Sequence, residues 1–274
     1  MTEGLTLITY NILQLPLFGS PRRATLAAQV LDDADADVVV LNEAFNRPAR
    51  QLVQGLSSRG YAVTPEVGRT HRDWTSSSGR DRRWDTLTGG GIYVASRFPV
   101  LEQHQHRYRA RKPLTSDALS KKGAALVALQ TPVGRLWVAA THLQADERGS
   151  HHAVRMQQLD ELRHFVASTA GAGEPVLVVG DLNVEYYADG RPSPELAEAE
   201  RTLGGTIIAG PIHEPTFDGS LNRVLPNRYR SYRNVLDYIG SIGPSLQIAT
   251  RTRTDEKARD ASDHFPVQAT VTIR

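Results

Sequence analysis

Short runs of hydrophobic residues, rich in β-branched side chains, alternate with polar segments along the chain. Such runs are typical of buried β-strands. They predict eight strands, over residues 5–10, 38–42, 91–96, 124–130, 136–141, 176–179, 236–239 and 267–273. Two other segments repeat their hydrophobic positions at helical spacing, which predicts helices over residues 22–34 and 152–170. Strands interleaved with helices predict an α/β fold in which two sheets pack together and helices cover them.

Composition adds limits to this fold. A chain of 274 residues with 40% hydrophobic residues can build one large core, so we expect a single domain over residues 1–274. The 32 Lys and Arg nearly balance the 30 Asp and Glu, which by itself does not favour a nucleic-acid partner. The absence of cysteine excludes disulfides and thiolate catalysis, so a metal site would use oxygen and nitrogen ligands. We expect a soluble chain, secreted if a leader precedes it and otherwise cytoplasmic.

Polar side chains recur at the ends of the predicted strands. The set comprises Asn11, Glu43, His142, Asp181, Asn183, Asp237, Asp263 and His264. If the sheets bring these ends to one edge, carboxylates, amides and imidazoles converge on a single cleft that a rigid scaffold supports.

Each of these residues also has a structural interpretation. Asn11 and the pair Asp181 and Asn183 suit turns, since Asn and Asp are common turn residues. His142 alone is compatible with a structural histidine, and Asp237 with a hydrogen-bonded core acid. Glu43 directly follows the apolar run VVVLN, where an unpaired carboxylate is costly, and this favours a metal or cationic partner.

The order of the motifs carries a resemblance that single residues do not. The chain resembles the endonuclease/exonuclease/phosphatase superfamily, which is related to DNase I. The matching motifs follow the order of the superfamily and cover nearly the whole chain: ITYNI, VLNEAF, GGGIYVASRFPV, ATHLQAD, VVGDLNV, LDYI and SDHFPV. Within this superfamily, the chain is most similar to bacterial neutral sphingomyelinases. The motifs that carry this narrower resemblance are SKKGAALVAL, THLQAD followed by VRMQQLDEL, and HEPTFDGSLN. The resemblance implies a four-layer α/β sandwich and a magnesium-dependent phosphodiesterase of the phospholipase C type, with Mn²⁺ or Co²⁺ as alternative ions.

The resemblance also implies roles around the metal and the phosphate. Glu43 would bind the divalent ion, and Asn11 would lie close to the ion or the phosphate. Asp181 would position the attacking water. Asn183 and His142 would hydrogen-bond the phosphate oxygens. In-line hydrolysis builds negative charge at phosphorus, which a hard cation and such donors stabilise.

The remaining residues concern proton transfer. His264 would act as the general base, because an imidazole titrates close to neutral pH. An acid would orient its ring, and Asp237 and Asp263 are both candidates. Adjacent residues of a strand point to opposite faces, so Asp263 is also compatible with a partner other than His264.

The substrate stays open between several classes. The 26 positions from Asp237 to Asp263 hold no aromatic residue beyond Tyr238, so the aromatic hairpin of membrane-active relatives is missing there. Residues 68–88 are expected to form a mobile loop. Its Trp74 and Trp84 would form a lid with two apolar tips and a weak membrane contact.

The expected partner is a phosphodiester, with a phospholipid favoured. The alternatives are a DNase or abasic-site nuclease gripping phosphates through arginine-rich residues 69–83 and 223–233, a soluble phosphoester, and a non-catalytic relative. We expect a monomer.

Overall fold

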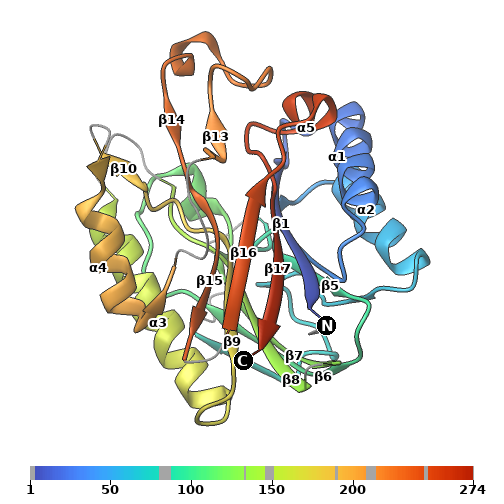
Figure 1. The fold of residues 1–274 in the computed structure, drawn as a ribbon, viewed down its shortest axis with the longest axis vertical. Coiled ribbons are helices and arrows are strands. Elements are labelled where there is room, and N and C mark those ends of the chain that lie inside the picture. The colour runs from blue at the N-terminus through green and yellow to red at the C-terminus, as the bar shows by residue number, and fades with distance from the viewer. Residues whose placement is uncertain are drawn as a thin grey trace.

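Two mixed β-sheets pack face to face, and helices cover the outer face of each sheet (Figure 1). The computed structural model describes residues 4–79, 88–132, 134–145, 151–188, 191–207, 214–243 and 246–273. The four layers confirm the predicted α/β sandwich. Among these residues, no helix has both the length and the hydropathy needed to cross a membrane.

The first sheet has six strands in the order β16-β17-β1-β2-β5-β3. These are β1 (Leu5–Gln14), β2 (Val38–Ala44), β3 (Ala62–Val63), β5 (Tyr93–Ser96), β16 (Leu246–Thr252) and β17 (Val267–Ile273). Only β1 and β2 pair in parallel. Their carboxyl ends therefore lie at the same edge of the sheet, where Asn11 and Glu43 stand.

The second sheet has seven strands in the order β12-β15-β9-β8-β7-β6-β4. These are β4 (Ser76–Gly79), β6 (Val100–Arg107), β7 (Gly123–Thr131), β8 (Gly134–His142), β9 (Val176–Asp181), β12 (Gly205–Thr206) and β15 (Asp237–Ile242). Two small ribbons stand apart, made of β10 (Tyr187–Ala188) with β11 (Arg191–Pro192) and of β13 (Phe217–Asp218) with β14 (Arg233–Asn234). Since β8 and β9 are parallel, their carboxyl ends also share one edge.

The helices fall into two groups, one on each outer face. α1 (Pro21–Ala34), α2 (Arg47–Ser58) and α5 (Glu256–Ala261) share a buried cluster with the outer face of the first sheet. α3 (His152–Thr169) and α4 (Pro194–Leu203) share another with the second sheet. Two short 3₁₀ helices complete the set, η1 (Ser116–Leu119) and η2 (Asn227–Tyr229).

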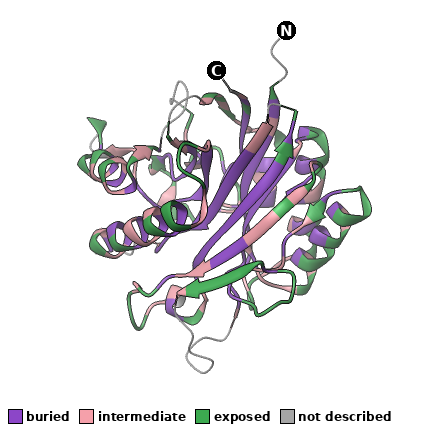
Figure 2. Ribbon diagram, turned by 90° about the horizontal axis from the view of Figure 1, so that it is seen from below, coloured by how far each residue is buried: buried purple, intermediate pink, exposed green. Residues whose placement is uncertain are grey.

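The core follows the alternation of the strands. Leu7 packs between the two sheets, whereas its neighbour Ile8 packs against the helices, and both are fully buried. Because successive side chains of a strand point to opposite faces, strands that are apolar at nearly every position serve both layers. Figure 2 shows the buried strands in the middle and the exposed faces of the helices outside them.

All eight predicted strands and both predicted helices are present, with ends shifted by a few residues. Three helices and several strands were not predicted. α2, α4 and α5 are short, and β6 reads VLEQHQHR, in which polar residues hide the strand pattern. The predicted loop 68–88 contains the edge strand β4.

The interpretation of Trp74 as an exposed apolar tip is wrong. Its side chain is only 7% exposed and belongs to the cluster between the two sheets. A tryptophan in this position contributes to the core, because its large apolar surface is removed from water. Trp84 lies outside the described residues.

Candidate active site

Three of the predicted site residues form one row across the second sheet. His142 at the end of β8 lies opposite Asp181 on β9, and Asp181 lies opposite Asp237 at the start of β15. Residues in register on neighbouring strands point to the same face, so the three side chains are brought together. All three are at most 2% exposed.

Gly180 allows β8 and β9 to approach at this row. Its φ of +139° is outside the range that side chains commonly adopt, and a Cβ atom there would lie 2.0 Å from the Thr141 carbonyl oxygen. The glycine before Asp181 is therefore required by the backbone.

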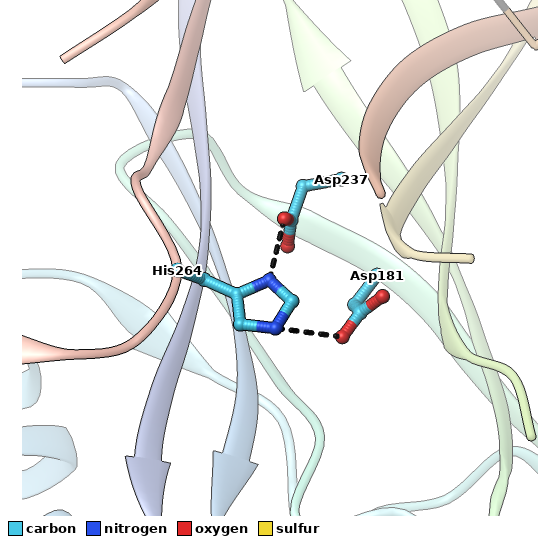
Figure 3. Close-up of side chains that lie close together, drawn as sticks. All are labelled: Asp181, Asp237 and His264. Carbon is cyan, nitrogen blue, oxygen red and sulfur yellow. Dashed lines mark hydrogen bonds and ion pairs between the residues drawn. The ribbon is translucent and has the colours of Figure 1, made fainter. Parts of the chain in front are cut away.

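His264 lies between two carboxylates (Figure 3). Its Nδ1 is 2.7 Å from Asp237 Oδ2, and its Nε2 is 3.8 Å from Asp181 Oδ2. Burial alone would lower the pKa of His264, but the charges of Asp237 and Asp181 outweigh burial and hold that pKa well above its ordinary value. Each of these three residues offers one atom that could ligate a metal ion, and these atoms lie within 4.8 Å of one another.

Of the two acids left open by the sequence, Asp237 is the one whose carboxylate contacts the His264 ring. Asp263 instead accepts a hydrogen bond from Ser262 Oγ at 3.3 Å. Its charge raises the pKa of both Glu43 and His264.

Glu43 carries a buried carboxylate oxygen with no protein partner. Within the described part of the chain, its Oε2 is buried and makes no hydrogen bond, and Oε1 is 4.0 Å from His142 Nε2. Burial, followed by the charge of Asp263, raises the pKa of Glu43 to about 8. Its φ of +55° lies in the left-handed region, which is strained for a glutamate. An oxygen held in this way suits a cation as its missing partner.

Two amides hold Asp181 in place. Asn11 Nδ2 donates to Asp181 Oδ2 at 2.9 Å, which links the two sheets. The backbone NH of Asn183 donates to Asp181 Oδ1 at 3.0 Å, and the Asn183 side-chain amide donates to the Leu143 carbonyl at 3.2 Å. Both carboxylate oxygens of Asp181 thus have an amide donor.

Sequence reasoning missed Lys122, which lies at the site with only 7% of its surface exposed. Its ammonium group is 2.8 Å from Asp117 Oδ2 and 3.1 Å from His142 Nε2, and it donates to the Leu143 carbonyl. Burial and this neighbouring positive charge lower the pKa of His142 to about 3, so His142 is neutral at physiological pH. The motif SKKGAALVAL contains this lysine, but a lysine before a strand gives no signal of burial.

Asn42 was also missed, and it joins the sheets beside the site. Its side-chain amide donates to the Thr141 carbonyl at 3.0 Å, and its Oδ1 accepts from the Asp181 NH at 3.1 Å. As the residue before Glu43, it could have been found by asking why a buried strand contains an amide.

Half-buried aromatic rings line the approach to His264. The Phe217 ring lies edge-to-face with the His264 ring at 5.2 Å, and it contacts Tyr229 and Tyr232 at 5.8 and 5.5 Å. The Tyr232 hydroxyl donates to the Glu185 carboxylate. These rings come from the β13–β14 ribbon and its loop, where the sequence pattern indicated only an arginine-rich segment.

Comparison with known proteins gives a consistent assignment. Over 296 residues, the chain is 32% identical to the sphingomyelinase C of Listeria ivanovii, covering 97% of this chain and 84% of that protein. It is 32% identical over 193 residues to a sphingomyelinase C of Leptospira interrogans, covering 66% of this chain and 34% of that longer protein. The structure of a Staphylococcus aureus beta toxin F277A, P278A mutant with bound magnesium ions superposes with a TM-score of 0.85 at 25% identity, covering 98% and 99% of the two chains.

The family assignment extends over nearly all of the chain. Residues 8–264 match the Endonuclease/Exonuclease/phosphatase family, so the match begins in β1 and ends at His264. The matched span includes His142, Asp181 and Asp237 of the row, His264, and Glu43 with its buried Oε2. The chain belongs to the endonuclease/exonuclease/phosphatase family.

Proposed function

We propose that this protein is a divalent-metal-dependent phosphodiesterase that hydrolyses sphingomyelin or a closely related phospholipid and releases the phosphorylated head group. The observation that carries the proposal is the buried pair of His264 and Asp237, with the second nitrogen of the imidazole turned toward Asp181. Sequence similarity to sphingomyelinases C supports the choice of substrate.

The residues present fit a divalent cation, with Mg²⁺ the first choice. Glu43 offers an oxygen with no hydrogen-bond partner among the described residues. Asn11 stands on the neighbouring strand β1 and donates to Asp181 on β9 of the second sheet. Mg²⁺ prefers oxygen ligands and needs only one or two carboxylates, because it keeps several waters. When bound, such an ion would neutralise charge building on the phosphoryl oxygens and offset the carboxylates that raise the pKa of His264.

The protein residues then have separate tasks. Asp181 orients the attacking water, and His264 Nε2 takes a proton from it while Asp237 stabilises the imidazolium that forms. Attack on phosphorus breaks its bond to the lipid oxygen, which takes up a proton from the solvent and leaves as the alcohol. Lys122 and Asn183 add positive charge and amide donors in a buried setting, where their effect is stronger than in water.

The aromatic rings beside His264 favour a choline head group. Phe217 contacts Tyr229 and Tyr232, the Tyr232 hydroxyl donates to Glu185, and the Arg228 guanidinium already lies over the Tyr229 ring. Aromatic rings that include a partner for one cation, together with an acid, are suited to a quaternary ammonium ion. A nuclease is the second candidate, because the loop that carries these tyrosines also holds Arg223, Arg228 and Arg230.

The test is phosphocholine release from sphingomyelin in mixed detergent micelles, with Mg²⁺ or EDTA, beside an abasic-site DNA duplex. We expect release only with the metal ion, and a loss of about 10²- to 10⁴-fold in His264→Ala, the usual size of a general-base effect. The variant should keep the parent's circular dichroism spectrum. Cleavage of the duplex without phosphocholine release would replace the proposal with a nuclease.

A further inference from the structure

Exposed apolar side chains are concentrated on three loops. The large hydrophobic residues exposed in the described part of the chain are Leu17, Phe18, Leu101, Leu114, Leu119 and Leu221. All except Leu101 lie in residues 15–23, 109–122 and 219–233, which we call the rim loops. Single exposed leucines are common on protein surfaces, but their gathering on particular loops points to an interaction site.

The rim loops all contact segments that carry the active site. Asn46, three residues after Glu43, donates to the Leu15 carbonyl. Asp117 accepts from the backbone NH of Ala145, which follows the strand that ends in His142. Asn222 donates to the Ser262 carbonyl, two residues before His264. The three loops therefore lie around the mouth of the site.

Leu101 lies at the other end of the second sheet. It stands at the start of β6, and its neighbour Val100 pairs with Leu129 near the end of β7. The active-site end of these strands is the opposite one, where Arg107 pairs with Gly123. Leu101 is thus a natural control for the rim-loop residues.

The rim-loop side chains are extreme in their exposure. Leu17 is 88% exposed and Phe18 is 74% exposed. Leu114 is fully exposed, and its φ of +64° places a leucine in the left-handed region that favours glycine. A fully exposed leucine in a strained backbone contributes nothing to the core, so folding does not explain it.

The rim loops are also strongly basic. They hold eleven Lys or Arg residues, of which Lys122 is buried at the active site, and one acidic residue, whereas the whole chain has a net charge of only +2. The rest of the chain is therefore net negative. Arg223 and Arg233 pair with acids of the protein, but Arg22, Lys112, Arg228 and Arg230 are exposed. A cluster of this kind attracts an anionic surface.

We propose that the rim loops form a docking face for an anionic phospholipid bilayer, with the apolar tips entering the interface and the basic side chains meeting the lipid phosphates. Apolar tips among basic residues are what interfacial binding requires, since each supplies part of the affinity. Nucleic acid would use the basic residues but gives no role to exposed leucines. The inference goes beyond the proposed reaction and does not depend on it.

Cosedimentation with vesicles tests the docking face without any catalysis. The vesicles contain phosphatidylcholine with about one third phosphatidylglycerol and no sphingomyelin. We expect binding by the parent, and a loss of roughly tenfold or more in the pair Leu17→Asp with Phe18→Asp and in the pair Arg228→Gln with Arg230→Gln. Leu101→Asp should bind like the parent. Binding should also weaken with salt and with pure phosphatidylcholine.

Each alternative outcome overturns the proposal. If Leu101→Asp lost as much vesicle binding as the rim-loop variants, the location of the apolar side chain on the rim loops would not matter for binding. If the parent failed to bind anionic vesicles, or bound only duplex DNA, the basic residues of the rim loops would not serve membrane docking. Leu17→Ser with Phe18→Ser adds no charge and repeats the test if the aspartate pair melts below the parent. Activity on detergent micelles should be unchanged in these leucine and phenylalanine variants, so docking and catalysis fail separately.

Discussion

At the scale of single residues, the bond between Asp237 and His264 decides which imidazole nitrogen is available. Nδ1 is held at 2.7 Å by the carboxylate, so Nε2 faces Asp181. A histidine fixed in this way keeps one orientation and one proton acceptor. The proposed general base thus depends on a residue that the sequence presents only as an acid inside a strand.

Replacing Asp237 by Asn should weaken this base. We expect Asp237→Asn to lose about 10²-fold or more in kcat, because the imidazolium loses its carboxylate partner. Removal of that charge should also lower the pKa of His264, so the rising limb of the kcat profile should move to lower pH. Steady-state kinetics across pH measure both effects. A kcat within twofold of the parent, with an unmoved profile, would show that Asp237 serves only the fold.

Glu43 gives a prediction about metal removal. In metal-free protein, Oε2 of Glu43 is buried without a hydrogen-bond partner among the residues that the structure describes, and the pKa of Glu43 is raised to about 8. Glu43→Gln should therefore melt at or above the parent in EDTA. Added Mg²⁺ should stabilise the parent by about 2.7 kcal/mol at a hundredfold excess over Kd, and the variant far less.

Differential scanning fluorimetry with EDTA and with Mg²⁺ measures this difference. The control is Glu256→Gln, since the Glu256 side chain is 76% exposed and belongs to α5. Equal stabilisation of Glu43→Gln and the parent by Mg²⁺ would remove Glu43 from the metal site.

At the scale of elements, α3 is tied to the turn after β6 by one carboxylate. Glu161 accepts from the backbone NH groups of Arg109 and Ala110, and His106 Nε2 lies 2.9 Å from it. Burial would raise the pKa of Glu161, but these hydrogen bonds outweigh burial and lower it below 4.5. The side chain is 20% exposed, so solvent screens it only in part.

This shift predicts a pH-dependent contribution to stability. A carboxylate with a lowered folded-state pKa stabilises the fold above the unfolded value near 4.5, and the gain is lost as pH falls through the folded value. Glu161→Gln should cost roughly 1.5–3 kcal/mol at pH 7, the size of charged hydrogen bonds. Urea unfolding at pH 7 and below pH 4 should show the difference shrinking in acid. A constant difference would mean that the charge of Glu161 is irrelevant.

At the scale of the whole molecule, the packing of the two sheets brings Asn11 and Asp181 together at the site. Asn11 comes from the first sheet and Asp181 from the second, and their bond spans the layer between the sheets. Leu7 lies in the same layer on the strand that carries Asn11, and it is fully buried. A change in the packing of the sheets therefore reaches the chemistry.

Leu7→Ala should lower the free energy of unfolding by about 2–5 kcal/mol, because it leaves a cavity that the close-packed layer fills only in part. Chemical unfolding measures this loss. Leu101→Ala, on an exposed position of β6, should change stability by less than about 0.5 kcal/mol. A small effect of Leu7→Ala would mean that the layer can collapse around the cavity.

The sequence by itself determined the eight strands, the two long helices and the identity of most residues that meet at the site. Runs such as VLVVG mark a strand without help from the rest of the chain, because burial on both faces requires apolar residues at every position. The strand ends singled out Asn11, Glu43, His142 and Asp181 because each stands where an apolar run stops, and the structure brings these side chains to one edge of the sheets.

Only the tertiary structure decided which groups touch. Several features of the site depend on segments that are distant in the sequence. They are the contact of His264 with Asp237 and not with Asp263, the burial of Lys122 and Trp74, and the ring contact between Phe217 and His264. Local patterns report whether a residue suits a strand or a turn, but contact depends on how the sheets are registered and stacked. The same holds for the rim loops. Their leucines and arginines are separate in the sequence, and only the fold places the three loops around one site.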